Sequence, residues 1–278
     1  MTTESDPRQS QREGRMTIEE YRAHPALNFS AAKILATMTP AHFREYVDGG
    51  GIEETVAMRM GTAVHDMLQG LPIRGVIKPA HLPGDPSDTW HGAKKWCKAW
   101  IAEQTEPVFS ADEYAATMGM RNALESHSLF STIMGLCPDR EQPVFAEYRG
   151  VQLKALLDMS GLDTQGNRFI ADLKTTDNAS AKKWARKMVD MLYHMQAAWY
   201  SNVAALAEEL DARPNFLFGV VESKPPHPVA IYSLPEEAWS NGQAMMDLAV
   251  DRYRECCESG IWAGYPEEIQ CLEWPKWA

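Results

Sequence analysis

Residues 151–174, VQLKALLDMSGLDTQGNRFIADLK, predict two strands joined by a turn. In the first strand, apolar residues at positions 151, 153, 155 and 157 alternate with other residues, and an acid, Asp158, follows. Residues 161–167 supply the glycines, aspartate and asparagine that turns use. In the returning strand, a period of two places Asp172 and Lys174 on the same side. A hairpin folded about this turn therefore brings Asp158 close to both residues.

Two carboxylates beside a lysine form a group with recognisable chemistry. Asp158 and Asp172 can hold a hard divalent cation and Lys174 can orient a water molecule, which is what hydrolysis of a phosphodiester requires. Charged residues at strand ends also commonly do no more than face solvent. The hairpin alone leaves both interpretations open, so the choice depends on what accompanies it.

Four motifs occur in a fixed order along the chain: GTAVH at residues 61–65, Asp158, DLK at 172–174, and QAAWY at 196–200. In this order they resemble the PD-(D/E)xK nucleases of the RecB-like branch, and within that branch the nuclease domain of exonuclease VIII (RecE) and related phage recombination exonucleases. The likeness covers residues 16–230, and supporting stretches are FSAAK at 29–33 with PAHF at 40–43, YHMQ at 193–196, and FGVVE at 218–222 with PPHPV at 225–229.

The resemblance implies roles for the residues of these motifs. Asp158 and Asp172 would bind Mg²⁺, which Mn²⁺ can also replace, and His65 and the backbone carbonyl of Leu173 would join them. Lys174 would polarise or position the attacking water. Taken without the family, a single histidine in a helix is more typical of a partly buried polar residue, so the metal-ligand role of His65 depends on the resemblance.

A second group of candidate residues lies on one predicted helix. Tyr193, Gln196 and Tyr200 are spaced i, i+3 and i+7, so they share one face. Taken alone, this spacing is typical of a mixed core face in which tyrosine and glutamine satisfy each other's hydrogen bonds. The resemblance implies instead that Gln196 and Tyr200 border the active site and contact DNA phosphate or orient Lys174, with Tyr193 as supporting structure only.

Three further residues carry two interpretations each. Glu147 precedes the hairpin and is either an additional acid near the metal or a solvated residue at a strand end. Ser30 and Lys33 resemble residues that such exonucleases use to hold a 5′ phosphate at the start of a helix. Ser30 can equally be an ordinary helix cap, and the two roles are compatible.

The predicted fold is a single α/β domain over residues 16–278, of the restriction-endonuclease-like type, with a central mixed sheet flanked by helices. Residues 1–15 are polar and are expected to form a disordered tail. Helical patterns cover residues 31–37, 52–68 and 179–210, whereas residues 71–87 are rich in proline and glycine and predict a loop. Trp90, Trp96 and Trp100 follow in an expected helix.

Composition limits the class of protein. An odd number of cysteines, five, argues against a disulfide framework, and the adjacent pair Cys256 and Cys257 does not have the spacing of iron–sulfur ligands, so we expect no such cluster. The sequence contains no apolar run of the ~20 residues that a membrane span needs and no signal-peptide pattern near its start. We therefore expect a cytoplasmic enzyme without a membrane partner.

The net charge of −11 opposes the usual requirement of DNA binding for lysine and arginine. Net charge averages over surfaces that never meet the ligand, so an acidic nuclease needs only a basic lining around its DNA. The candidate lining residues are Lys33, Arg44, Arg59, Lys94, Lys95, Lys98, Lys182, Lys183, Arg186 and Lys187.

The resemblance implies 5′→3′ digestion of linear double-stranded DNA from its ends, with release of 5′-mononucleotides and 3′ single-stranded overhangs for phage recombination. It also implies a ring of three or four copies and a single-strand annealing protein as partner. Aromatic residues after Pro235 are candidates for contacts between subunits: Trp239, Trp262, Trp274 and Trp277. Alternatives are an endonuclease or a nuclease of other polarity on the same fold, or a noncatalytic DNA-binding protein.

Overall fold

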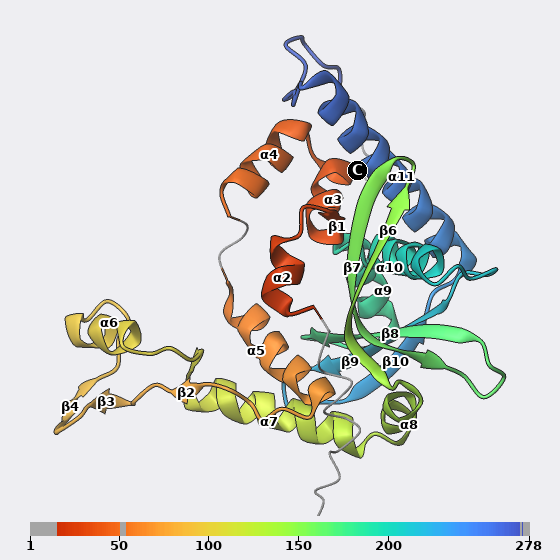
Figure 1. Ribbon diagram of the computed structural model, residues 1–278. Coiled ribbons are helices and arrows are strands. Elements are labelled where there is room, and N and C mark those ends of the chain that lie inside the picture. The colour runs from red at the N-terminus through yellow and green to blue at the C-terminus, as the bar shows by residue number, and fades with distance from the viewer. Residues whose placement is uncertain (1–15, 51–53, 273, 275–278) are drawn as a thin grey trace, which may run out of the picture.

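Six strands form the central sheet of the computed structural model, which describes residues 16–50, 54–272 and 274. The strands pair with their neighbours in both parallel and antiparallel fashion, so the sheet is mixed, as predicted. The order across the sheet is β1 (Leu27–Asn28), β7 (Val151–Leu162), β8 (Arg168–Thr176), β9 (Asn215–Glu222) and β10 (Val229–Ser233), and β6 (Asp139–Tyr148) pairs with β7 (Figure 1).

Helices cover the sheet on two sides, and each side has its own apolar cluster. Alternate residues of one strand enter different clusters: Val220 of β9 belongs to the first and Val221 to the second. The first side is covered by α3 (Phe29–Thr37), α10 (Tyr193–Ala207) and α11 (Glu236–Ser259), and the second by α5 (Val56–His65), α7 (Ala111–Ser126) and α8 (Ser128–Leu136) (Figure 1). This arrangement confirms the predicted α/β fold with a mixed sheet flanked by helices.

The hairpin of β7 and β8 forms as predicted, but its turn is shorter. Gly161 and Leu162 still pair with β8, so the turn covers residues 163–167. The Asp163 side chain organises this turn, because its Oδ1 accepts hydrogen bonds from the backbone N–H groups of Gln165 and Asn167, both at 2.8 Å.

A second hairpin joins β6 to β7 through the two-residue turn Arg149-Gly150. Both residues have left-handed backbones, with φ angles of 51° and 78°, which is the requirement of a type I′ turn. Tyr148 faces Val151 across the turn, and the register continues to Asp139 opposite Ser160. This turn therefore fixes which residue of β6 lies opposite each residue of β7.

Helix boundaries differ from the sequence patterns at two places. The prediction of a single helix over residues 179–210 is wrong, because this region forms two helices. Leu192 has a left-handed backbone (φ 58°) and separates α9 (Ala181–Asp190) from α10. The break lets α10 bury nine residues while α9, with most of its face in solvent, buries only Trp184. The pattern over 52–68 becomes α5, capped by Thr55, and the 3₁₀ helix η1 (Asp66–Gln69), while Ile52 lies outside the described residues.

The proline-rich region projects from the body as an arm over residues 71–109 (Figure 1). Trp90 packs edge-on against Trp96 and Trp100, with ring centroids 5.3 and 5.6 Å away, and Trp90 precedes the helix rather than lying in it. The arm consists of β2 (Val76–Ile77), β3 (His81–Leu82), β4 (Asp85–Thr89), α6 (Lys95–Ala102) and β5 (Val108–Phe109). That the whole of 16–278 is one domain stays a prediction.

Two of the tryptophans proposed for subunit contacts also pack within the chain. Trp239 is buried in the first apolar cluster, and Trp262 stacks on Phe43 of α4 (Pro40–Asp48) with a centroid distance of 5.1 Å. Trp277 and the predicted tail 1–15 lie outside the described residues, whereas Trp274 is 81% exposed. No helix in the described part of the chain combines the length and hydropathy of a membrane span.

Candidate active site

The hairpin of β7 and β8 brings its acids together at the point where the strands separate. Their pairing ends at Met159 and Ala171, and the next position on each strand is Asp158 and Asp172. Beyond the last backbone pair, the Asp158 side chain replaces a backbone carbonyl as the acceptor: its Oδ2 accepts a hydrogen bond of 2.9 Å from the N–H of Leu173. Both acids are buried, with 9% and 1% of their surface exposed. The predicted convergence is thus observed.

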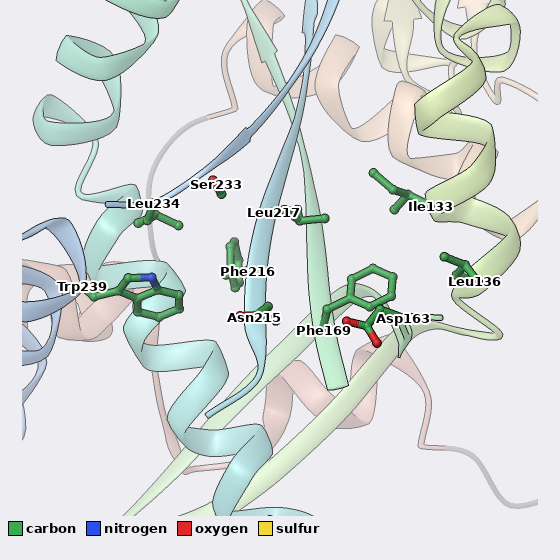
Figure 2. A pocket seen from close by; sticks show the side chains of 10 residues that line it. All are labelled: Ile133, Leu136, Asp163, Phe169, Asn215, Phe216, Leu217, Ser233, Leu234 and Trp239. Carbon is green, nitrogen blue, oxygen red and sulfur yellow. The ribbon is translucent and has the colours of Figure 1, made fainter. Parts of the chain in front are cut away.

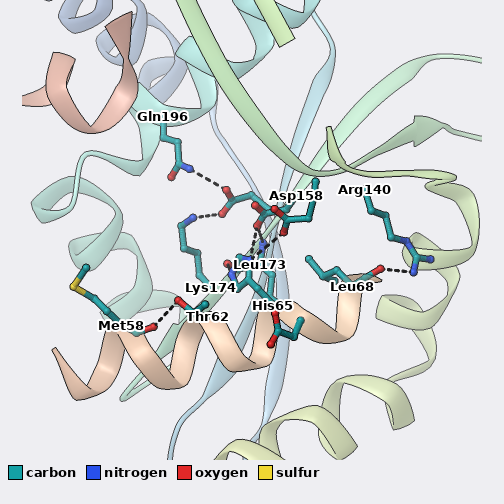
Figure 3. Close-up of polar contacts among 12 residues, drawn as sticks. Met58, Thr62, His65, Leu68, Arg140, Asp158, Leu173, Lys174 and Gln196 are labelled. Atoms are coloured by element: carbon teal, nitrogen blue, oxygen red, sulfur yellow. Dashed lines mark hydrogen bonds and ion pairs between the residues drawn. The ribbon is translucent and has the colours of Figure 1, made fainter. Parts of the chain in front are cut away.

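Both oxygens of Asp172 have partners that hold the carboxylate in one orientation. The side-chain amide of Gln196 donates to Oδ1 at 2.9 Å, and the ammonium of Lys174 forms an ion pair with Oδ2 (Figure 3). The Lys174 side chain is only 16% exposed. Asp172 and Lys174 therefore form a buried ion pair. Both residues lie on β8, and Gln196 of α10 holds the second oxygen of Asp172.

His65 enters the site from the last residue of α5 (Figure 3). Its Nε2 lies 2.8 Å from the carbonyl of Leu173, and its Nδ1 lies 3.4 Å from Oδ2 of Asp158. A proton on Nε2 would be donated to this carbonyl, which leaves Nδ1 unprotonated and directed at the acid. Histidines that bind metals are commonly oriented by such a bond from the other ring nitrogen.

Glu141 is a site residue that the sequence did not reveal. Its carboxylate, that of Asp158 and a nitrogen of His65 offer one ligand atom each, and these atoms all lie within 4.8 Å of one another. The β6–β7 register runs from Arg140 opposite Met159 to Gln142 opposite Leu157, which places Glu141 opposite Asp158. Glu141 itself has a left-handed backbone, with φ 49°.

The interpretation of Glu147 as an acid near the metal is wrong. Glu147 is exposed near the other end of β6, where it lies opposite Gln152 and accepts a hydrogen bond of 3.2 Å from that side chain. The signal that could have identified Glu141 is the turn at Arg149-Gly150, because a two-residue turn fixes the register of every later pair. Arginine is uncommon at a left-handed turn position, so this signal is weak.

The acids of the site outnumber the positive charge of Lys174, which pairs with Asp172. Burial, and then the charges of Asp158, Asp172 and Asp66, raise the pKa of Glu141 to about 8. Burial likewise raises the pKa of Asp172 to about 6, although Lys174 opposes this change. Burial therefore disfavours the charged form of both carboxyl groups, and the neighbouring acids add to this effect.

A divalent cation fits this cluster. Its donors are the carboxylates of Glu141 and Asp158 and a nitrogen of His65, which are hard oxygen and borderline nitrogen ligands. Asp172 lies at the next position of β8, across from Asp158. Oδ2 of Asp172 is buried and, among the described residues, has no hydrogen-bond donor besides its ion pair with Lys174. The carbonyl of Leu173, predicted as a ligand, has a second lone pair beside the one that faces His65.

Two tyrosines of α10 accompany Gln196 at the site. The Lys174 ammonium lies 5.0 Å from the centre of the Tyr193 ring, so Tyr193 contacts the candidate catalytic lysine directly. Burial raises the pKa of Tyr200, and the charges of Asp172 and Asp158 raise it further, so its phenol lies near both acids. The predicted face of Tyr193, Gln196 and Tyr200 therefore faces the catalytic cluster.

Ser30 and Lys33 are the two candidate phosphate-binding residues, and of these Lys33 interacts electrostatically with the candidate site. Burial lowers its pKa and the charge of Lys174 lowers it further, so the two ammonium groups lie near each other. Ser30 is exposed at the second position of α3. It is not the helix cap, because Asn28 holds that position and accepts a 2.8 Å hydrogen bond from the N–H of Ala31.

The other basic residues divide into paired and exposed groups. Arg44, Arg59 and Lys94 form ion pairs with Asp48, Glu54 and Asp88. The ammonium of Lys187 donates to the hydroxyl of Thr176 at 3.1 Å, two residues beyond Lys174 on β8. The remaining candidates are exposed on α6 and α9: Lys95, Lys98, Lys182, Lys183 and Arg186.

The sequence matches, over residues 28–275, the family described as a PDDEXK-like domain of unknown function (DUF3799). The match covers most of the chain, and the chain belongs to this family. This result confirms the predicted PD-(D/E)xK superfamily, whose nucleases use divalent metals. The more specific likeness to exonuclease VIII stays a prediction.

Solved structures agree with the fold. A crystal structure described as a putative exonuclease from Eubacterium rectale aligns with a TM-score of 0.65 and 14% identity, over 94% of this chain and 96% of that chain. A structure of SSO0001 aligns with a TM-score of 0.37 and 13% identity, over 85% of this chain and 81% of that chain, and carries no argument. No curated protein sequence matches the chain.

Proposed function

We propose that this PDDEXK-like protein is a divalent-metal-dependent exonuclease that degrades linear double-stranded DNA in the 5′→3′ direction. It would release 5′-mononucleotides and leave 3′ single-stranded overhangs that recombination can use. The observation that carries the proposal is the convergence of Asp158, Asp172 and Lys174 with Glu141 and His65 at one partly open point of the sheet. Such a group serves phosphodiester hydrolysis.

The carboxylates of Glu141, Asp158 and Asp172, with His65 and the carbonyl of Leu173, are the proposed ligands of Mg²⁺ or Mn²⁺. Such a cation, when bound, supplies a Lewis acid that lowers the pKa of water and neutralises charge on the attacked phosphate. Mg²⁺ suits a site rich in carboxylate oxygen.

Lys174 is proposed to position the attacking water and the phosphate as a cation. Burial alone lowers its pKa, but Asp172 and Asp158 outweigh burial and raise it, so the ammonium stays protonated at neutral pH. A protonated lysine donates hydrogen bonds and cannot act as a general base. Its work is therefore electrostatic, and it adds to the charge that Lys33 brings to the same region.

The remaining roles concern the DNA. Gln196 orients Asp172 through the bond to Oδ1, and Tyr200 beside it borders the path of the scissile phosphate. Ser30 and Lys33 are proposed to hold the 5′ phosphate near the start of α3. Polarity and preference for duplex ends rest on the motif resemblance, and the description of the Eubacterium rectale protein as an exonuclease agrees with digestion from ends.

Labelled DNA tests the proposal. A linear duplex carrying 5′ or 3′ label, and a closed circular duplex, are incubated with the protein with and without Mg²⁺. We expect label to be released first from the 5′ ends of linear DNA, only with metal, and the circle to stay intact. Cleavage of the circle would identify an endonuclease, early 3′ release would reverse the polarity, and binding without cleavage would identify a noncatalytic protein.

Assembly and partners form a separate part of the proposal. We infer a closed ring of three or four copies around the DNA and a single-strand annealing protein that receives the 3′ strand during phage recombination. Processive digestion checks the ring: excess unlabelled duplex added after initiation should leave degradation of the engaged DNA largely unchanged. Immediate inhibition by that competitor would exclude a threaded ring while leaving the nuclease proposal intact.

A further inference from the structure

The segment after α11 exposes apolar side chains that monomeric proteins usually bury. Ile269 is 102% exposed, Leu272 is 91% exposed and Trp274 is 81% exposed. Within the described part of the chain, the hydrogen bonds and ring contacts of this segment to the body end at Tyr265, whose ring lies 5.8 Å from that of His42. Residues 266–272 and Trp274 are defined here as the apolar tail, and a cluster of exposed apolar side chains marks a site of protein contact.

A second feature of the molecule is an apolar hollow (Figure 2). Its volume is about 280 Å³, and it lies between α8, the start of β8 and β9, and the first turn of α11. Its lining is mainly apolar: Ile133, Leu136, Phe169, Phe216, Leu217, Leu234 and Trp239, with Asp163, Asn215 and Ser233 at polar positions. None of the residues that line the hollow belongs to the candidate active site, so the two are separate.

The tail of one chain cannot enter the hollow of the same chain. Trp239 in the hollow and Gly260 before the tail are separated by most of α11, which spans roughly 30 Å at 1.5 Å per residue. The tail is held at Tyr265, and even the seven residues from there to Leu272 extend at most about 25 Å, less than the length of α11. Figure 1 shows the end of α11 and α8 at opposite ends of the molecule.

Charge supports a match between these two regions. Glu267 and Glu268 precede the apolar residues of the tail. Arg213 lies next to the hollow, with its guanidinium 3.7 Å from the ring centre of Trp239, and its side chain is 40% exposed. Its only ion pair among the described residues is a long one of 3.8 Å to the exposed Glu236, which contributes little. An acidic tail can replace that partner.

We infer that the apolar tail of one copy docks into the hollow of a second copy, with Ile269 or Leu272 inserted and Glu267 or Glu268 beside Arg213. Because the two surfaces differ and lie at opposite poles, the contact is head to tail, and repetition of it closes a ring or extends a filament. This inference concerns contacts between subunits, and it stands or falls independently of nuclease activity.

A complementation experiment tests the contact in the full-length protein. The tail variant carries Ile269→Glu and Leu272→Glu, and the hollow variant carries Ser233→Phe, which fills the hollow from its exposed rim. Sedimentation velocity should show an oligomer for the wild type and a monomer for each variant. A mixture of the two variants should form a dimer and nothing larger, because only one intact tail and one intact hollow can meet.

Three results would overturn the inference: a monomeric wild type, an oligomer that survives both variants, or a mixture that stays monomeric. Cys271 offers a second test that does not depend on disrupting the fold, since this exposed thiol lies between the two inserted residues. Ser233→Cys should give disulfide-linked multimers on mild oxidation, and adding Cys271→Ser should abolish them. Linkage that persists without Cys271, or no linkage at all, would place the tail elsewhere.

Discussion

The strands and the helices contribute to the candidate site in different ways. The strands carry its charges: Asp158, Asp172 and Lys174 on β7 and β8, with Glu141 on β6. Each of the first three has a partner on a helix, and these contacts are His65 to Asp158, Gln196 to Asp172 and Tyr193 to Lys174. The sheet thus supplies the charged groups of the candidate site, and the helices on its two sides contact these groups.

This difference has consequences for mutation. A strand residue is held by the sheet through its own backbone, as Asp172 and Lys174 are by their pairing with β9, and a charge removed there has no neighbour that can replace it. A helix residue acts on that charge through one contact, and loss of the contact lets the charge move without removing it. Variants of the strand residues should therefore cost more activity than variants of their helix partners.

The largest effects are expected for Asp172→Ala and Lys174→Ala, each with a loss of at least about 10²-fold in cleavage rate, as is typical for a lost catalytic charge. The reasons differ, and calorimetry with Mg²⁺ should separate them. Asp172→Ala should weaken metal binding, whereas Lys174→Ala should retain metal and DNA binding and slow the chemical step. A variant that keeps more than about a tenth of the wild-type rate would contradict its assigned role.

Glu141→Gln should reduce the cleavage rate by roughly tenfold to a hundredfold, because a ligand of the metal is lost while its shape remains. Glu147→Gln is the matched control, since Glu147 lies on the same strand but is exposed and opposite Gln152. It should cleave at the wild-type rate. Equal losses of cleavage rate in both variants would show that activity depends on negative charge anywhere on β6, and not on the carboxylate opposite Asp158.

The same substitution should stabilise the metal-free protein near pH 8. Burial and neighbouring acids raise the pKa of Glu141 from 4.5 to about 8, so the folded state holds a proton that the unfolded state loses. Stability conferred by this proton is fully present below about pH 4.5 and is lost progressively as the pH rises to about 8. Thermal unfolding in chelator should show a smaller decline for Glu141→Gln than for wild type, and Mg²⁺ should reduce the difference.

The two hairpins show how much of this site the sequence contained. For β7 and β8, the period of two, the polar turn and the spacing of Asp172 and Lys174 were enough to predict the convergence with Asp158. For β6 and β7, the turn depends on Arg149 in a left-handed conformation, which no local preference of arginine predicts. Without that turn the sequence does not determine the register, and Glu147 stands as the candidate in place of Glu141.

The helices show a different limit. The spacing of Tyr193, Gln196 and Tyr200 predicted their common face, and the family motif predicted that Gln196 and Tyr200 lie at the site. The break at Leu192 was not predicted, because residues 179–210 have suitable helical composition throughout and only packing against the sheet separates α9 from α10. Likewise, that Tyr193 contacts Lys174 follows from tertiary structure and has no signature in the local sequence.

His65→Ala tests the helix partner of Asp158. We expect about a tenfold increase in the Mg²⁺ concentration needed for half-maximal cleavage, with excess metal restoring part of the rate, because the acids on the strands remain. The measurement is a metal titration of cleavage of linear duplex. An unchanged metal requirement together with a normal rate would make His65 a structural residue that only holds the Leu173 carbonyl.

The smallest effect is expected at Tyr193, which reaches the chemistry only through Lys174. A cation–π contact at 5.0 Å is worth roughly 1 kcal/mol, so Tyr193→Leu should lower kcat by about fivefold and leave KM for DNA nearly unchanged. Tyr193→Phe keeps the ring and also its stacking against Trp184, and should cleave as the wild type does. If phenylalanine is as impaired as leucine, the hydroxyl is the active group. If Tyr193→Leu is as active as the wild type, Asp172 alone positions Lys174, and α10 does not help to direct the Lys174 ammonium.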